Sequence, residues 1–394
     1  MDLDVLKAQL CQRIDELAQT LVDVSHQIHE HPELGYQEHY AHDLLTSILA
    51  IQRDIEVDGG AYDLPTAFVA RSGTEGPEVA ICCEYDALPG IGHACGHNVI
   101  AAAGLGAGLA LAAAAGDAGG RVRMLGTPAE EGGAGKVLMA DRGAFEGVDA
   151  ALMVHPASAD MATMEVLAAS LLEVDYHGQA AHAAAFPHLG RNALDAAVLG
   201  YVNVAALRQH IESTQRIHGV FTRGGDKANI VPDHTAMSWM VRSARAASLV
   251  PLRERVVACL EAGAAAAGCR MEYRIASRDY ADMIDNPVLL ELYGANSEVL
   301  GRPLAPTAPS PEVRVTGSTD MGNVSYLVPS IHPMIKVAPA GVSIHTSAFA
   351  DHARSPEADQ AVIDGAKAMA LTVADLWARP GAMTDVRAAF DPRS

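Results

Sequence analysis

Residues 79–98 read VAICCEYDALPGIGHACGHN, a short apolar run followed by a dense cluster of ionisable side chains. The run Val79–Cys83 is typical of a buried β-strand, and the cluster begins where that strand would end. Two further short runs, Arg121–Leu125 and Ala150–Val154, lead in the same way into GTPAEEGG and HPAS. Because ligands bind beyond the carboxyl ends of strands in open parallel sheets, the pattern predicts an α/β domain with one site at that edge.

The composition is that of a large folded protein with an acidic surface. A length of 394 residues predicts two domains, or one large domain with an insertion. Hydrophobic residues make up 49% of the chain and charged residues 19%, which excludes intrinsic disorder. The net charge of −20 argues against nucleic acid and anionic membranes as partners.

Cysteine usage and the N-terminus predict a cytoplasmic protein. Six scattered cysteines in a chain of this length do not form a disulfide framework. The first residues form a charged amphipathic helix without the apolar segment of a signal peptide. The apolar stretch from Ile100 to Gly116 is mostly Ala and Gly, which favours a helix inside a protein core over a membrane span.

The middle of the chain has strands of a different kind. Apolar and polar residues alternate near 172–177, 237–242 and 271–275, and less regularly over 217–223, which indicates strands with one buried face. Helical patterns lie between them, near 192–211 and 250–267. The order strand, helix, strand, strand, helix, strand is that of a ferredoxin-like α+β unit. We expect this unit at 168–281, inserted between two parts of a catalytic domain at 1–167 and 282–394, with a final helix near 361–378.

The side chains after the predicted strands, together with one near the C-terminus, form a set typical of a metal site. The set comprises Cys95, His97, Glu131, His155 and His345. Thiolate, imidazole and carboxylate together suit zinc, with manganese, cobalt and nickel as alternatives, and are too soft for calcium or magnesium. Five ligands exceed what one tetrahedral ion needs, which favours two metal ions. Taken singly, each residue has a structural explanation, such as a buried apolar cysteine.

Two pairs of carboxylates accompany this set. Glu84 and Asp86 lie at the end of the first strand. Burying two ionised carboxylates there would cost free energy unless they contact a cation or accept hydrogen bonds. Glu130 and Glu131 lie between a strand and a Gly pair. Adjacent carboxylates often mark a solvated turn, but here one could bind metal while its neighbour takes a proton from water.

Six motifs, in their order along the chain, resemble those of metallopeptidase family M20, which includes aminoacylases, carboxypeptidases and amidohydrolases. They are HQIHEHPELGYQEH, EYDALPGIGHACGHN, GTPAEEGGAGK, GQAAHAAAFPHLGRNALDA, GDKANIVPDHTAMSWMVR and SIHTSAFADHA. Within the family, the chain is most similar to the amidohydrolase branch, and there to the aminobenzoyl-glutamate-hydrolase-like and dipeptidase-like subgroup. The resemblance covers nearly the whole chain.

The resemblance implies a mixed-sheet, two-metal, aminopeptidase-like catalytic domain with a lid domain that forms a homodimer. It makes Cys95, His97, Glu131, His155 and His345 the ligands of two divalent ions per subunit. The catalytic residues would be Glu130 as general base, Asp86, and His182 acting in the partner subunit's site. His182, Asn229 and Arg242 would contact the substrate. Independently, Arg242 alternates with the apolar residues of its strand, so we expect it on the sheet face that the helices leave uncovered.

The expected activity is hydrolysis of the amide bond of N-acyl amino acids or related small conjugates, with release of a free amino acid. A dipeptidase or carboxypeptidase acting on small peptides is the alternative within the same chemistry. A non-catalytic metal-binding regulator is a third hypothesis, which the retention of Glu130 beside all five ligands disfavours. Three departures from the usual pattern of the branch concern the substrate and leave the ligand set intact: Glu84 and Asn98 for Asp, and Thr319 for Glu.

Overall fold

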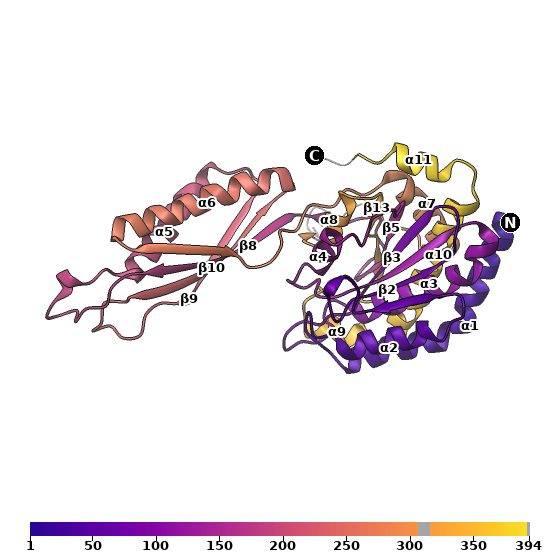
Figure 1. Cartoon of the computed structure of the whole chain (residues 1–394), viewed down its shortest axis with the longest axis horizontal. Helices are drawn as coiled ribbons and strands as arrows, with labels where there is room; N and C mark the ends of the chain where they lie inside the picture. Colours follow the sequence, from indigo (N-terminus) through magenta and orange to yellow (C-terminus); the bar gives the residue numbers. More distant parts are fainter. Residues whose placement is uncertain (306–315, 392–394) are drawn as a thin grey trace. The chain divides into compact units, whose positions relative to one another are not determined.

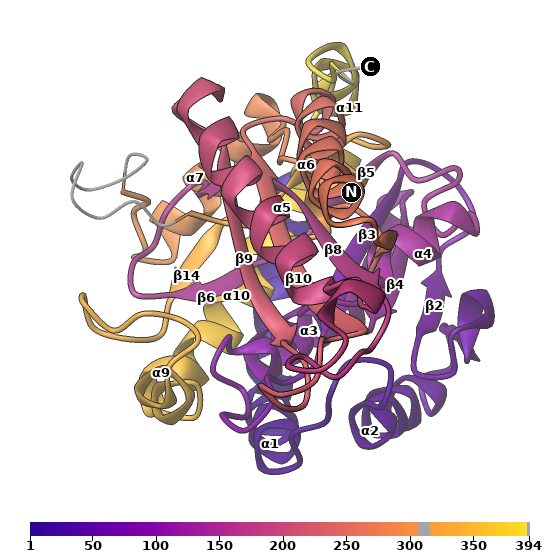
Figure 2. The same cartoon turned by 90° about the vertical axis from the view of Figure 1, so that its left-hand side faces the viewer.

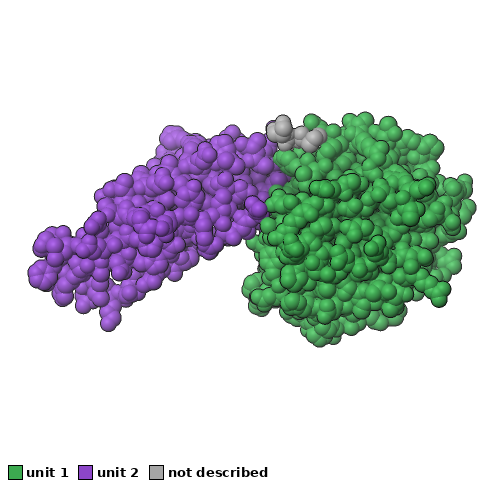
Figure 3. Space-filling model, viewed as in Figure 1, with its two compact units in different colours: residues 1–165, 283–393 green, residues 166–282, 394 purple. Residues whose placement is uncertain are grey.

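The chain forms two compact units (Figure 3) in this computed structural model, which describes residues 1–305 and 316–391. The first unit combines Met1–Glu165 with the chain from Met283 onward. The second unit is Val166–Asp282, where the sequence analysis places an insertion at 168–281.

A six-stranded mixed sheet forms the centre of the first unit, in the order β1-β2-β4-β3-β5-β13. Its central strands are β3 (Glu78–Glu84), β4 (Arg121–Thr127) and β5 (Ala150–Leu152), and β3 runs parallel to both of its neighbours. The remaining strands are β1 (Glu56–Gly59), β2 (Phe68–Ser72) and β13 (Ser330–Ile331). Strand β2 is antiparallel to β4, so the sheet is mixed.

The apolar run of β3 is continuous because both faces of the sheet are covered. Val79 and Ile81 belong to one hydrophobic cluster, and Ala80 and Cys82 belong to another. Successive side chains of a strand point to opposite faces, so a strand buried on both sides must be apolar at every position. The last residue, Glu84, is also fully buried and lies where the strand meets the site.

Three long helices pack against one another on one side of this sheet (Figure 1): α1 (Leu3–Glu30), α3 (His97–Ala118) and α10 (Pro356–Ala378). Helix α3 is long and apolar enough to cross a membrane by length and composition, and 83% of its most apolar window is buried within the protein. Its glycines permit close contact with its neighbours. A Cβ atom at Gly108 would lie 2.0 Å from the Met124 sulfur, and one at Gly106 would lie 2.6 Å from Leu21.

The remaining elements of the first unit are short or lie at its periphery. They are α2 (His39–Ala50), α4 (Gly135–Asp141), β6 (His155–Ala157), α7 (Pro287–Val299), β12 (Thr316–Gly317), α8 (Met321–Ser325), β14 (Met334–Lys336), α9 (Ser347–His352) and α11 (Ala382–Ala388), with one turn of 3-10 helix at Ala61–Asp63. The short strand β7 (Glu165–Val166) contains the boundary between the two units.

Several elements differ from the predicted bounds, and two of these differences have a clear local cause. The run expected as a single strand over Ala150–Val154 ends at Leu152, and a new strand, β6, begins at His155, because the chain leaves the central sheet there and pairs with β14. The helix expected near 361–378 begins already at Pro356. Ser355 caps it by accepting a hydrogen bond from the Ala358 amide, and proline suits the first helical position.

The second unit contains a four-stranded antiparallel sheet and two long helices. Its elements follow the order β8 (Ala168–His177), α5 (Ala193–Leu207), β9 (Arg216–Arg223), β10 (His234–Ser243), α6 (Ala246–Ala267) and β11 (Arg270–Ile275), with two turns of 3-10 helix at Pro187–Leu189 and Arg208–His210. The strand order in the sheet is β11-β8-β10-β9. Helices α5 and α6 lie side by side (Figure 2), over a core that contains Tyr176, Trp239 and Leu260.

Candidate metal centre

The five predicted ligands come together in the first unit from four separate segments. Cys95 lies in the loop after β3 and His97 is the first residue of α3; Gly96 between them has a φ of +79°. A Cβ atom at Gly96 would lie 2.9 Å from Pro156, so glycine fits both the conformation and the close approach of the segment carrying His155. Glu131 follows β4, and His345 precedes α9.

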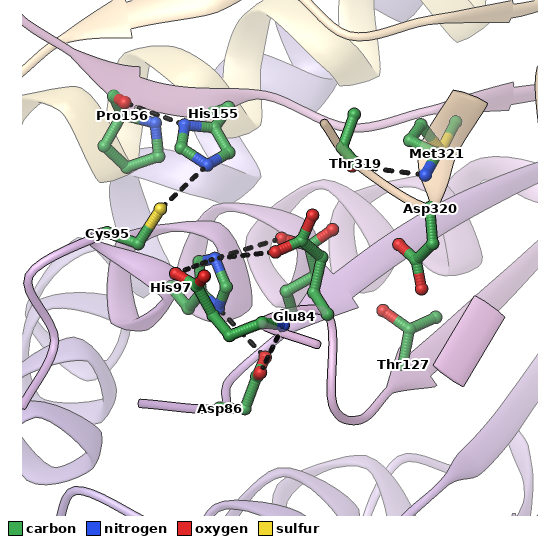
Figure 4. A network of polar contacts seen from close by, with 12 residues as sticks. Glu84, Asp86, Cys95, His97, Thr127, His155, Pro156, Thr319, Asp320 and Met321 are labelled. Carbon is green, nitrogen blue, oxygen red and sulfur yellow. Dashed lines mark hydrogen bonds and ion pairs between the residues drawn. The ribbon is translucent and has the colours of Figure 1, made fainter. Parts of the chain in front are cut away.

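One group of ligand atoms consists of Cys95, His97 and His155 (Figure 4), whose donor atoms lie within 4.8 Å of one another. The Cys95 sulfur is 3.4 Å from His155 Nε2. His155 Nδ1 donates to the Pro156 carbonyl oxygen at 2.8 Å, so Nε2 is the nitrogen that remains for a metal. All three side chains are buried, which suits a site that excludes water.

A second group consists of Cys95, Glu131 and His345, again within 4.8 Å. His345 Nε2 lies 3.2 Å from Glu131 Oε1. The side chain of His345 is 49% exposed, so this side of the site is the one open to solvent. Cys95 belongs to both groups, which places the thiolate between two clusters of ligand atoms.

Asp86 holds two of the predicted ligands in place. Its Oδ1 accepts a hydrogen bond from His97 Nδ1 at 3.0 Å, and its Oδ2 accepts one from the backbone amide of Glu131 at 2.9 Å. The first contact leaves His97 Nε2 free for a metal, as in the carboxylate–histidine pairs that support metal sites. Asp86 therefore acts on the site through His97 and Glu131.

A metal fits the residues that are present. His97 Nε2 and Glu84 Oε2 are buried and make no hydrogen bond in the described part of the chain. A buried polar atom without a partner is costly, and a divalent cation between these donors would remove that cost. Thiolate, imidazole and carboxylate are the donor types that zinc and its neighbours in the transition series prefer.

The environment shifts the pKa of several of these groups. Burial, together with the charges of Glu84 and Glu131, raises the pKa of Glu130 well above its usual range. Burial, together with the His97 cation, lowers the pKa of His155 to about 4, so this imidazole is neutral at pH 7 as a metal ligand must be. Burial also raises the pKa of the Cys95 thiol, so metal binding must release a proton there.

Sequence reasoning missed a buried ion cluster next to these ligands. The Lys136 ammonium is fully buried and lies 2.5 Å from Glu84 Oε1 and 2.6 Å from Asp320 Oδ1. Lys136 ends the motif GTPAEEGGAGK, but a single lysine after a Gly-rich turn is usually exposed, so nothing in the local sequence indicates that it is buried. Two further buried histidines, His93 and His332, also lie near the site: His93 interacts electrostatically with His97, and the centroid of the His332 ring lies 5.2 Å from that of His155, with the two rings tilted by 35°.

One of the departures from the branch pattern, Asn98, has a structural explanation. The side-chain amide of Asn98 donates to Ser25 Oγ at 2.9 Å and to the Ala353 carbonyl at 2.8 Å, and an ionised Asp could donate neither bond. Thr319 accepts a hydrogen bond from the Met321 amide at 3.2 Å, at the start of α8.

The predicted substrate residues lie in the second unit. His182 is exposed, and its Nδ1 accepts hydrogen bonds from the amides of Ala184 and Ala185 at 3.3 and 3.2 Å. Asn229 lies beside it, because the Asn229 carbonyl accepts from the Ala183 amide at 3.1 Å. Arg242 is half-buried on β10, on the opposite sheet face from Trp239 and Val241.

Known proteins resemble this chain along nearly its whole length. The chain is 38% identical to the Xaa-Arg dipeptidase of Mus musculus, over 99% of this chain and 93% of the relative. It is 28% identical to one of the subunits of the p-aminobenzoyl-glutamate hydrolase of Escherichia coli K12, over 93% of this chain and 91% of the relative.

The fold of the chain also matches the fold of solved structures. A dinuclear metal-binding peptidase of the M20 family from Bacillus subtilis superimposes with a TM-score of 0.66 at 20% identity, covering 91% of this chain and 98% of that one. The sequence model described as peptidase family M20/M25/M40 matches residues 80–375. The matched segment contains every predicted ligand, and the chain belongs to peptidase family M20/M25/M40.

Proposed function

We propose that this enzyme cleaves the peptide bond of dipeptides with the help of two divalent metal ions, and that it releases an amino acid with a free carboxylate. The family and the relatives make the chain a hydrolytic enzyme of amide or peptide bonds. The observation that carries the proposal is the convergence of ligand-type side chains around Glu130, whose Oε2 lies 3.9 Å from His97 Nε2.

The ions would be held by the five predicted ligands, with zinc as the first choice and manganese, cobalt and nickel as alternatives. Two bound divalent ions polarise a carbonyl group and make water acidic enough to lose a proton near neutral pH. The chain's own contribution is to fix the ligands. Asp86 orients His97 and Glu131, and the Pro156 carbonyl orients His155.

Glu130 is assigned the proton transfers. It accepts a proton from the attacking water, whose oxygen forms a bond to the carbonyl carbon of the substrate. When the carbon–nitrogen bond breaks, Glu130 returns the proton to the leaving amine, so acid and base roles alternate on one carboxyl group. His182 is assigned to the developing negative charge on the carbonyl oxygen.

Arg242 and Asn229 are assigned to the free carboxylate of the substrate, where a charge-assisted contact favours the ionised group. A basic C-terminal side chain is the first substrate choice, since the mouse relative is an Xaa-Arg dipeptidase. The net charge of −20 also favours cationic substrates. N-acyl amino acids remain the second candidate, which the similarity to the E. coli aminobenzoyl-glutamate hydrolase favours.

We also propose a cytoplasmic homodimer that forms through the second unit. Helix α5 exposes three neighbouring apolar side chains, Val198, Leu199 and Val202, which are 45%, 41% and 57% exposed. Apolar side chains grouped on one helix face are typical of an interface.

A substrate panel tests the activity. Purified protein is loaded with Zn²⁺, Mn²⁺ or Co²⁺, and release of free amino acid is measured from Ala-Arg, Ala-Lys, Ala-Leu, N-acetyl-Arg, aminobenzoyl-Glu and the amide of Ala-Arg. We expect the highest kcat/KM for Ala-Arg and Ala-Lys, and a large loss for the amide. Faster cleavage of N-acetyl-Arg than of every dipeptide would replace the proposal with the acylase function, and no release from any substrate would overturn both.

A further inference from the structure

Glu84 is a carboxylate beside the metal centre that has no role in the ligand set, in the proton transfers or in the positioning of the ligands described above. It ends strand β3, is fully buried, and lies close to His97 (Figure 4). Its two oxygens have different surroundings. Oε1 contacts the Lys136 ammonium at 2.5 Å, whereas Oε2 makes no hydrogen bond and lies 3.4 Å from His97 Nε2.

The separation of these two atoms is the one expected for two ligands of a single ion. Zinc binds imidazole nitrogen and carboxylate oxygen at about 2.0–2.2 Å, so two such donors at a tetrahedral angle are about 3.4 Å apart. His97 Nδ1 is already bonded to Asp86, which leaves Nε2 as the metal-binding nitrogen. Glu84, His97 and Glu130 also form a group whose donor atoms lie within 4.8 Å of one another.

We propose that Glu84 is a further ligand of the metal centre, sharing with His97 one of the two ions, and that Lys136 holds its second oxygen. The inference rests on the proposed metal centre and adds a sixth protein ligand to it. Glutamate is longer than aspartate by one methylene group. The Glu at this position, where the related branch usually has Asp, therefore brings an oxygen to His97 while still reaching Lys136.

The Lys136 ammonium reduces the free-energy cost of burying Glu84 as an ionised ligand. Burial favours the neutral amine, but the charges of Asp320 and Glu84 outweigh it and keep the pKa of Lys136 well above its usual range. The ammonium is thus a fixed positive charge on the side of Glu84 away from His97. A lone ionised carboxylate in a dry site would be costly, and Lys136 together with an ion would compensate it on both sides.

The competing explanation is that Glu84 serves only as a counter-ion for Lys136. Asp320 separates the two explanations, because it also pairs with the Lys136 ammonium and contacts its backbone amide, yet belongs to none of the ligand groups. Asp320→Asn is therefore the matched control for Glu84→Gln. Both changes remove one negative charge beside Lys136, and only one removes a donor that faces His97.

The experiment measures ion binding directly. Zn²⁺ affinity and stoichiometry of the wild type, Glu84→Gln and Asp320→Asn are determined by competition with a chromophoric chelator, and the visible absorption of the Co²⁺-loaded proteins reports coordination. We expect Glu84→Gln to bind one of its two ions about 100-fold more weakly or worse, because loss of an outer partner alone costs about 10–100-fold. Its Co²⁺ spectrum should also change, while Asp320→Asn stays close to the wild type in both measurements.

Equal affinity and spectra for the wild type and Glu84→Gln would overturn the role of Glu84 and leave the two-ion centre standing. Equal losses in Glu84→Gln and Asp320→Asn would assign Glu84 to Lys136 alone. A wild type that binds no ion would overturn the centre itself. If Glu84→Gln does not fold, Glu84→Asp replaces it: this variant keeps the counter-charge for Lys136 and withdraws the oxygen from His97, so unchanged binding would again overturn the inference.

Discussion

Removal of the Asp86 carboxylate should weaken metal binding although Asp86 itself is not a predicted ligand. The carboxylate accepts hydrogen bonds from His97 Nδ1 and from the amide of Glu131, and so orients one ligand from each of two segments. In Asp86→Ala both donors lose their partner. The His97 ring can then rotate, and Nδ1 no longer fixes the tautomer that leaves Nε2 for the metal.

The size of the effect follows from how many hydrogen bonds each substitution removes. Loss of one outer partner of a metal ligand costs about 10–100-fold in affinity. Asp86→Asn keeps one acceptor oxygen and should fall in that range, whereas Asp86→Ala affects two ligands and should weaken binding by about 100-fold or more. Two buried donors left unpaired should also lower the free energy of unfolding by about 1–3 kcal/mol each.

The assay is a titration of Zn²⁺ against a chelator of known affinity, with thermal unfolding recorded for each variant. Asp149→Ala serves as the control, because Asp149 also accepts a backbone hydrogen bond, from the Glu78 amide at 2.8 Å, but is not among the candidate metal-binding residues. We expect wild-type Zn²⁺ affinity for the control. A folded Asp86→Ala protein with wild-type Zn²⁺ affinity would refute the positioning role.

Four further outcomes are expected. Glu130→Gln should retain its metal and lose about 10²–10⁴ in kcat, and loss of the metal instead would exchange the roles of Glu130 and Glu131. Arg242→Ala should lower kcat/KM for dipeptides far more than kcat/KM for their amides, by about 1.5–3 kcal/mol, and an equal loss for both would contradict a contact with the substrate carboxylate. Mixed His182→Ala and Glu130→Gln subunits should recover up to about a quarter of wild-type activity, if half the molecules are mixed dimers with one intact site; no recovery after confirmed subunit exchange would exclude action across the dimer. Glu38 is fully buried just before α2, where its carboxyl group contacts the Thr66 hydroxyl and the Ala129 amide, and this burial raises its pKa from 4.5 to about 6. The folded state therefore favours the protonated carboxyl group, and the stability that this group contributes is full below pH 4.5 and is lost as the pH rises through 6. Urea unfolding in chelator should therefore show Glu38→Gln gaining about 2 kcal/mol on the wild type between pH 4.5 and 7, and parallel pH profiles would contradict this.

The sequence predicts best the features that repeat at short range. Alternation in the second unit places its strands to within a few residues, because one face of that sheet packs on α5 and α6 and the other does not. The apolar run of β3 is recognisable because both faces of the central sheet are covered. The break between Leu152 and His155 carries no such signal, since it depends on pairing with β14, far along the chain.

The residues of the metal site also differ in how well the local sequence predicts them. Cys95, His97 and the Glu130–Glu131 pair stand out because ionisable side chains gather after predicted strands. The contact between Lys136 and Asp320 joins residues 184 positions apart, and neither residue is unusual in its local sequence. Their importance comes from complete burial, which is a property of the fold, and so could not be predicted from local patterns.

Helix α3 has a consequence for how the protein is made. The helix has almost no polar surface, and its packing partner α10 lies about 240 residues further along the chain. At about 5–20 residues per second, a ribosome needs roughly 12–50 s to synthesise the intervening chain. During that interval a segment hydrophobic enough for a bilayer has only α1 and the early strands to cover it. The nascent enzyme thus depends on its last long helix to remove an aggregation-prone surface, and a chain truncated before α10 would keep that surface exposed permanently.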